Sequence, residues 1–198
     1  MEYRKALARD SKLKRILKTE VVYPKKTKSV SMSLVTSILS QQLSIKVAKV
    51  MKLRFLELYG GRVPTAQEIL DTPNETIKGI GISQSKANYI HNVAGFIIDN
   101  KLTLAKLQKL SDEEVIELLT QIKGVGRWTV EMLLIFGLGR EDVFAVDDLG
   151  IQKGMIGIFQ LQDLSKKELR LRMQELSKRW SPYRSFVCLH LWNFQGFE

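Results

Sequence analysis

Apolar positions along the chain recur mostly at helical spacing, and the alternation typical of strands is almost absent. Two such rows are Ala48, Met51, Phe55 and Leu58, and Ala87, Ile90, Ala94 and Ile97. The segment "DVFAV", residues 142–146, is the only strand candidate, and it is short. The pattern therefore predicts an all-α chain of about ten helices, most of them brief.

Three helix starts carry a second signal, a Ser or Thr that precedes Glu by three residues. This spacing is typical of the capping box, in which each side chain bonds to the other residue's backbone amide. The three pairs are Thr65 with Glu68, Ser111 with Glu114, and Ser165 with Glu168. The best boundary is the stretch "YPKKTKS", residues 23–29, which separates a basic N-terminal helix from the helical block that starts near Met32.

Composition adds a basic charge to this helical pattern. The 198 residues carry a net charge of +10, and 26% of them are charged. Lys and Arg gather in residues 1–28 and again in residues 166–184, which favours a polyanionic partner such as nucleic acid. No apolar run approaches the roughly 20 residues of a membrane span, and the N-terminus lacks the core of a signal peptide. We expect a soluble protein inside the cell, with no membrane partner.

Cysteine and histidine are too few for the usual metal centres. Cys188 is the single cysteine, so an internal disulfide, a four-thiolate zinc site and an iron–sulfur cluster are excluded. Cys188 lies in the apolar stretch "SFVCLHLW" and is expected to be a buried core residue. We expect no cofactor and no catalytic metal.

The stretch "QIKGVGRWTVEML", residues 121–133, predicts a tight turn between a helix that ends near Thr120 and one that starts around Arg127. Gly124 and Gly126 are expected to permit backbone conformations closed to other residues and a close approach of a ligand to the main chain. Amides at the start of the second helix would then face an anion, in a basic protein a DNA phosphate. The alternative is a simple tight connection in which Val125 fills the core.

These residues carry a resemblance. "IKGVGRWTVEML" followed by "VFAVDDLGIQKG", with "ILSQQLSIKVA" upstream and "RWSPYRSFVCLHLW" downstream, resembles the helix–hairpin–helix DNA glycosylases, and within them the 3-methyladenine DNA glycosylase II branch. The match runs from about Leu34 to Gly196. It implies a two-lobed all-α fold with the active-site cleft between the lobes. One lobe would be residues 32–138, with the hairpin at about 120–130, and the other residues 1–31 plus 139–198. No extra N-terminal β domain is expected.

The resemblance places the catalytic carboxylate at Asp148, twenty residues after Trp128. Loss of a base from DNA develops positive charge on the deoxyribose, and a fixed carboxylate beside the sugar stabilises that charge. The alternative role for Asp147 and Asp148 is to cap the helix that begins "DLGIQKGM", and we expect Asp147 to do so. Whether Asp147 also shares the catalytic role stays open.

The resemblance also assigns a base pocket. Trp128 and Trp192 would form aromatic walls, which suit a cationic alkylated purine, and Gln41 and Met132 would line the same pocket. Relatives that also cleave the DNA strand have lysine at the position of Trp128 and form a Schiff base with it. Because tryptophan supplies no amine, the resemblance implies base removal without lyase activity at an abasic site. Trp180 is expected to be a core residue.

The remaining expected contacts are with the DNA backbone and the stack. The turn "SQQLS", residues 40–44, would place Gln42 as the wedge that enters the gap left by the flipped base. Phosphate contacts are expected from Gly124, Gly126, Arg127 and Thr129. By correspondence with the family, the carbonyls of Thr120, Ile122 and Val125 would hold a structural monovalent cation, if one is bound.

We therefore expect a monomeric monofunctional DNA glycosylase that flips out alkylated purines of the 3-methyladenine type from double-stranded DNA and so initiates base-excision repair. It would act in the nucleoid of a prokaryote or the nucleus of a eukaryote. One alternative is a glycosylase for deaminated or oxidised bases. Another is a helix–hairpin–helix protein that binds DNA without catalysis, although such a protein needs neither the aspartate nor the two tryptophans.

Overall fold

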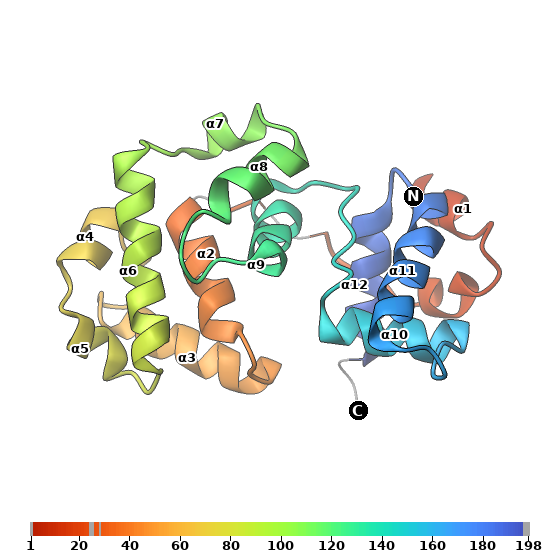
Figure 1. Cartoon of the computed structure of the whole chain (residues 1–198), viewed down its shortest axis with the longest axis horizontal. Helices are drawn as coiled ribbons and strands as arrows, with labels where there is room; N and C mark the ends of the chain where they lie inside the picture. The colour runs from red at the N-terminus through yellow and green to blue at the C-terminus, as the bar shows by residue number, and fades with distance from the viewer. Residues whose placement is uncertain (1, 24–25, 28, 196–198) are drawn as a thin grey trace. The chain divides into compact units, whose positions relative to one another are not determined.

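A computed structural model describes residues 2–23, 26–27 and 29–195 of the chain, and throughout these residues the secondary structure is helical, with no strand (Figure 1). The prediction of an all-α chain is confirmed. The chain divides into two compact units. One consists of Met1–Lys25 and Gly139–Glu198, and the other of Lys26–Leu138.

The unit Lys26–Leu138 is built around one buried helix, α2 (Val30–Ser40). Eight of its eleven residues are buried, and it contacts α3, α6 and α9 as well as the π-helical segment η2. In Figure 1, α6 runs along the flank of this unit, where it packs against α2, α4 and α5. The other elements are α3 (Ile45–Glu57), α4 (Ala66–Asp71), α5 (Asn74–Lys78), α6 (Gln84–Asp99), α7 (Leu104–Gln108), α8 (Asp112–Leu119), α9 (Arg127–Met132) and η2 (Leu133–Leu138).

The division between Lys25 and Lys26 falls inside the stretch 23–29 that the sequence offered as the best boundary, and six residues before the start of the lobe 32–138 that the resemblance implied. The Thr27 amide donates to the Gly137 carbonyl at 3.0 Å, and the Ser29 hydroxyl accepts from the Met32 amide as the N-cap of α2. These bonds join the segment to helices of its own unit. The basic and polar residues of this segment gave no indication of these hydrogen bonds in the sequence.

All three predicted capping boxes are present, at the starts of α4, α8 and α11 (Lys166–Ser177). In each, the Ser or Thr side chain accepts from the amide of the Glu, and the Glu carboxylate accepts from the amide of the Ser or Thr. Helices of six to twelve residues cannot form on propensity alone. Such caps, together with burial of one face, stabilise them in the fold.

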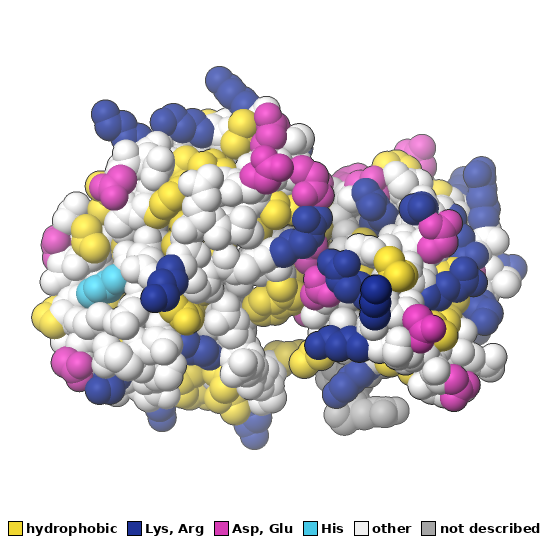
Figure 2. Space-filling view, viewed as in Figure 1, with side chains coloured by type: hydrophobic (Ala, Val, Ile, Leu, Met, Phe, Trp, Pro, Cys, Tyr) yellow, Lys and Arg dark blue, Asp and Glu magenta, His cyan; other side chains and the backbone are white. Residues whose placement is uncertain are grey.

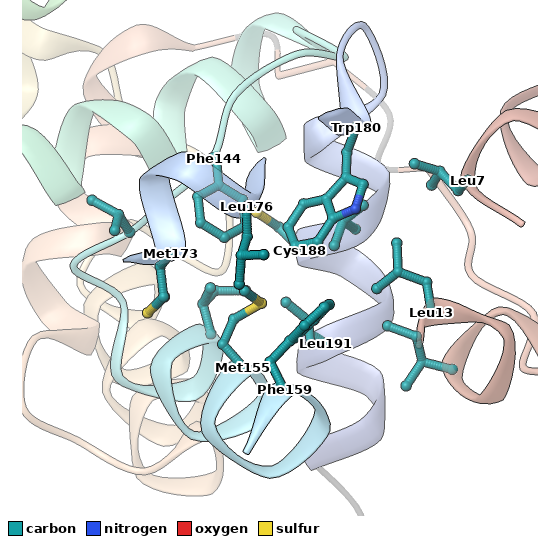
Figure 3. Close-up of a cluster of buried hydrophobic side chains, with 14 of the residues drawn as sticks. Leu7, Leu13, Phe144, Met155, Phe159, Met173, Leu176, Trp180, Cys188 and Leu191 are labelled. Atoms are coloured by element: carbon teal, nitrogen blue, oxygen red, sulfur yellow. The ribbon is translucent and has the colours of Figure 1, made fainter. Parts of the chain in front are cut away.

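The second unit packs its helices around one hydrophobic core, which Figure 3 shows at close range. Trp180 belongs to this core with only 1% of its surface exposed, and its ring centroid lies 5.7 Å from those of Phe144 and Phe159. The predicted core roles of Trp180 and of Cys188, which is fully buried, are confirmed. The elements of this unit are α1 (Glu2–Leu7), η1 (Leu13–Lys18), α10 (Leu149–Phe159), α11, η3 (Lys178–Trp180) and α12 (Arg184–Gln195).

The strand candidate, residues 142–146, is an irregular segment beside α12. Val143 donates its amide to the Ser185 hydroxyl at 3.0 Å, and Ser185 donates its own amide to the Glu141 carbonyl at 2.9 Å. The backbone is thus paired with the start of a helix. The apolar residues of the segment are buried, which explains a strand-like sequence without a strand.

His190, on α12, is fully buried, and its Nε2 lies 3.4 Å from the Tyr3 hydroxyl of α1. Burial lowers the pKa of His190 to about 4, so the imidazole stays neutral at physiological pH.

Within the described residues, no helix has the length and apolar character needed to cross a membrane.

Candidate functional site

The glycine turn after α8 has the boundaries expected from the sequence. Thr120 is the C-cap of α8, Gly126 is the N-cap of α9, and Arg127 is the first residue of α9. Inside the turn, the Val125 amide donates to the Ile122 carbonyl at 2.9 Å, and the Val125 side chain is 4% exposed. The turn is therefore anchored by a buried aliphatic side chain and leaves Gly126 exposed.

The two glycines of this turn have different reasons to be glycine. Gly124 has φ +102°, and a Cβ placed there would lie 2.1 Å from Cγ of Tyr89. Gly126 has φ −97° and ψ 173°, which any residue adopts, and a Cβ there would meet no heavy atom within 4 Å. The expectation that both need glycine's backbone freedom is therefore wrong for Gly126. No contact described within the chain requires a glycine at that position.

Arg127 was expected to contact phosphate, but its guanidinium is engaged inside the unit. Nη1 and Nη2 donate to the Glu113 carboxylate at 3.1 and 2.7 Å, and Nε donates to Glu131 at 3.1 Å. The paired carboxylates, Glu113 first, raise the pKa of Arg127 above its ordinary value. A phosphate would have to compete with two carboxylates for this side chain. The backbone amide of Arg127, at the start of α9, is the simpler donor.

Thr129 and Gln41 form one local contact. The Gln41 Nε2 donates to the Thr129 hydroxyl at 3.2 Å and to the Gly124 carbonyl at 3.3 Å. Thr129 is only 1% exposed, so a phosphate contact there would use its backbone amide and not its side chain. The predicted contact itself stays a prediction. Gln41 ties the end of α2 to the hairpin. Its predicted place in a base pocket stays a prediction.

The turn between α2 and α3 contains the predicted wedge. Gln42 is exposed and has φ +61°, a left-handed conformation that is uncommon for residues other than glycine. Lys86 of α6 stabilises this turn, because its ammonium donates to the carbonyls of Gln41 at 2.8 Å and Leu39 at 3.2 Å. Removal of the ammonium from water lowers the pKa of Lys86 below its usual value. The structure thus holds an exposed side chain at the tip of a strained, braced turn.

Trp128 and Met132 both lie on α9, four positions apart. Trp128 is half-buried, and Met132 is 8% exposed. Their spacing places them on the same side of the helix. Their predicted roles in base binding stay predictions.

Asp148 is the N-cap of α10 in the other unit. Its Oδ1 accepts the Ile151 amide at 2.9 Å and the indole N–H of Trp192 at 2.8 Å. The residue is 9% exposed. Its backbone is held as well, since the Asp148 amide donates to the Ala145 carbonyl at 3.1 Å. A carboxylate is therefore fixed at the positive end of a helix dipole in a mostly buried position.

Asp147 was expected to be the cap of α10, and this is wrong. Asp147 instead forms an ion pair with Arg170 of α11, whose Nε and Nη2 lie 2.8 and 3.2 Å from its two carboxylate oxygens. Both side chains are about 40% exposed. Adjacent carboxylates cannot both reach the first free amides of one helix, and only the second residue stands at the N-cap position.

Several site contacts carry no local sequence signal. Lys86, Glu113 and Arg170 each meet their partner from a different helix. Gly150 is similar: a Cβ there would lie 3.1 Å from Cδ1 of Trp192 and 3.2 Å from Oδ1 of Asp148. The only sequence signal for Gly150 is its place two residues after the aspartate pair.

Metal binding finds limited support. In the part of the chain that the structure describes, no group of three or more His, Cys, Asp or Glu side chains is arranged to hold an ion. Of the three carbonyls predicted to hold a monovalent cation, that of Ile122 already accepts the Val125 amide. A carbonyl has two acceptor positions, so the cation site stays a prediction.

Comparison with known proteins agrees with this geometry. The family model described as "HhH-GPD superfamily base excision DNA repair protein" matches residues 35–182. A DNA-3-methyladenine glycosylase of Schizosaccharomyces pombe is 38% identical over 161 residues, which are 80% of this chain and 69% of that protein. A DNA-3-methyladenine glycosylase of Saccharomyces cerevisiae is 34% identical in an alignment 190 residues long, which covers 80% of this chain and 64% of that protein.

Among solved structures, a Schizosaccharomyces pombe 3-methyladenine DNA glycosylase in complex with abasic DNA is similar over the whole chain. The TM-score is 0.89 at 33% identity, and the match covers 100% of this chain and 98% of that one. The similarity therefore includes both helical units and not the hairpin alone.

The contrast between the two glycines gives a stability prediction. Gly124→Ala should lower the free energy of unfolding by about 2–4 kcal/mol, because it combines a strained φ with a clash against Tyr89. Gly126→Ala should cost no more than about 1 kcal/mol, the loss of a favourable N-cap residue. Urea denaturation of the two variants measures both values, and equal losses would contradict the distinction.

Proposed function

We propose that this chain is a monofunctional DNA glycosylase for alkylated purines. The chain belongs to the HhH-GPD superfamily of base excision DNA repair proteins. It removes the damaged base by hydrolysis of the N-glycosidic bond and leaves an abasic site. Its relatives' names support 3-methyladenine as the substrate class.

The fixed carboxylate of Asp148 is the observation that carries this proposal. The glycosidic bond is hidden in the duplex, so the nucleotide must first be extruded, at a cost of a few kcal/mol that is lowest for damaged bases. As the base leaves, the deoxyribose gains positive charge. A carboxylate that is already oriented and mostly removed from water stabilises this charge without reorganising. A protein that only holds duplex DNA needs no such group.

The absence of strand cleavage is inferred from Trp128. A lyase step requires an amine that forms a Schiff base with the sugar. By resemblance, strand-cleaving relatives place lysine at the position that Trp128 occupies, and an indole cannot replace it. The abasic site is therefore the final product of this chain.

An alkylated purine suits the chemistry that these residues offer. N-alkylation gives the ring a positive charge, so the bond to the sugar is weak before the enzyme acts and no general acid is required. The face of a tryptophan such as Trp128 attracts such a cation by roughly 0.5–2 kcal/mol. Neutral oxidised or deaminated bases lack this attraction and leave less readily, which favours the alkylated class.

DNA binding is inferred from charge and from the hairpin. On the unit that contains α10 and α11, Lys and Arg side chains cover much of the visible face (Figure 2). The exposed ones on α11 and η3 are Lys166, Lys167, Arg172, Lys178 and Arg179. On the other unit, two features support a phosphate contact: the backbone amides at the start of α9, after Gly126, and the open space at Gly126.

The experiment that tests the function is release of bases from DNA treated with a methylating agent. The released bases are identified by chromatography, and the DNA is examined for breaks before and after alkali. We expect methylated purines in the soluble fraction and breaks only after alkali. Release of oxidised or deaminated bases alone, or no release, would refute the proposed substrate or the proposed activity. Covalent trapping of the wild-type protein on DNA by borohydride would refute the monofunctional assignment.

Asp148→Asn should abolish base release and leave binding to damaged DNA largely intact. Asparagine keeps the size and polarity of the side chain but removes the charge that stabilises the sugar cation, so a loss of at least about 100-fold in rate is expected. Single-turnover release measures the rate, and a gel-shift titration measures the affinity. Asp147→Asn is the matched control, since it breaks only a surface ion pair and should keep substantial activity. Equal losses in both variants would contradict the assignment.

Affinity for duplex DNA should fall by roughly 10- to 1,000-fold between about 50 and about 200 mM salt, because Lys and Arg displace counterions from phosphates. Gly126→Val should weaken binding roughly tenfold for every sequence, because its branched side chain blocks the approach of a phosphate without straining the backbone. Fluorescence anisotropy with labelled duplexes measures both. Gly157→Val is the control, because that glycine is exposed and a Cβ there also meets nothing within 4 Å. An unchanged affinity for Gly126→Val would remove the hairpin contact from the account.

A further inference from the structure

Two N–H groups from different elements converge on one oxygen of Asp148. The Ile151 amide reaches Oδ1 from the first turn of α10 at 2.9 Å, and the Trp192 indole N–H reaches it from α12 at 2.8 Å. The first bond is the usual N-cap contact and lies within one helix. The second joins the carboxylate to a side chain 44 residues later in the chain.

We propose that Trp192 is a positioning residue for the catalytic carboxylate, and that its indole N–H, more than its ring face, is what the reaction requires. This inference rests on the proposed function, in which Asp148 stabilises the sugar cation. The sequence resemblance assigned Trp192 to an aromatic pocket wall. The edge of its ring is instead committed to the carboxylate.

The geometry explains why a second donor is needed. A carboxylate held by one amide of its own helix can still rotate about its Cα–Cβ and Cβ–Cγ bonds. A donor from α12 removes that freedom, because α10 and α12 pack against each other and side chains of both helices belong to one hydrophobic core. The orientation of the carboxylate plane then follows the packing of two helices. For a group that must face a charge as it develops, a fixed orientation is an advantage in itself.

The contact between Asp148 and Trp192 is closely packed on the side of Gly150. A Cβ on Gly150 would lie 3.1 Å from Cδ1 of Trp192 and 3.2 Å from Oδ1 of Asp148, closer than ordinary van der Waals contact in both cases. A glycine at the second position of α10 lets the indole approach the carboxylate. The Gln152 side chain adds a bond to the Val146 carbonyl at 3.0 Å, which fixes the segment that leads into Asp148.

Trp192→Phe tests the inference, because it keeps an aromatic ring and removes only the donor. We expect kcat for release of methylated purines to fall about 10- to 100-fold, the effect of one lost hydrogen bond to a charged group, with KM little changed. A ring that serves only as a pocket wall predicts the reverse, with kcat retained and KM raised.

The chain offers a matched control. Trp180 also donates its indole N–H to an aspartate, Asp10, at 2.9 Å, but it belongs to the hydrophobic core and not to the site. Trp180→Phe should lower stability and leave kcat of the folded protein unchanged. If both variants lose the same kcat, the effect of Trp192→Phe is a general loss of packing and the inference is overturned.

A readout that needs no activity separates this inference from the proposed function. In ¹⁵N-labelled protein, Asp148→Ala should move the indole N–H resonance of Trp192 upfield and speed its exchange with solvent, while that of Trp180 stays in place. An unmoved Trp192 resonance would show that the bond is not formed and would overturn the inference. A wild-type protein that releases no methylated base, with the resonance shift present, would instead refute the function and leave the contact standing.

Discussion

The carboxylate of Asp148 lies mostly out of water, and removal of a charge from water is costly unless hydrogen bonds replace the lost hydration. Here the helix that follows supplies one donor and its dipole, and α12 supplies another donor through Trp192. These requirements explain much of the surrounding sequence. Gly150 leaves room for the indole, and Gln152 holds the preceding segment. The core around Trp180 keeps the helices of this unit together.

The other unit is organised around a turn rather than a charge. Gly124 is required by the fold, because its backbone conformation and the ring of Tyr89 exclude a side chain. At Gly126, neither the backbone conformation nor any neighbour among the described residues excludes a side chain. A group outside the chain, such as a bound phosphate, would explain a glycine there. The guanidinium of Arg127 is already paired with Glu113 and Glu131, which supports the proposal that backbone amides make the phosphate contact.

Local patterns predicted local structure. The three capping boxes, the boundaries of the hairpin and the core role of Trp180 follow from residues close together in sequence or from apolar periodicity. What failed or was missed depends on partners from other helices. Asp148 caps α10 because its backbone stands at the N-cap position, while Asp147 pairs with Arg170 on α11. Spacing along the chain could not reveal that Trp192 bonds to Asp148, or that Lys86 braces the turn that bears Gln42.

The central claim is that Asp148 recognises positive charge on the sugar, and binding measures it without turnover. Two duplexes are compared, one with a cationic pyrrolidine in place of the damaged nucleotide and one with a neutral tetrahydrofuran of similar shape. Because an enzyme binds a mimic of its transition state more tightly than a neutral analogue, the wild-type protein should prefer the cationic duplex by about 100-fold or more. Asp148→Asn should reduce that ratio to near one, while Asp147→Asn keeps it. Equal affinity of the wild-type protein for both duplexes would contradict the account.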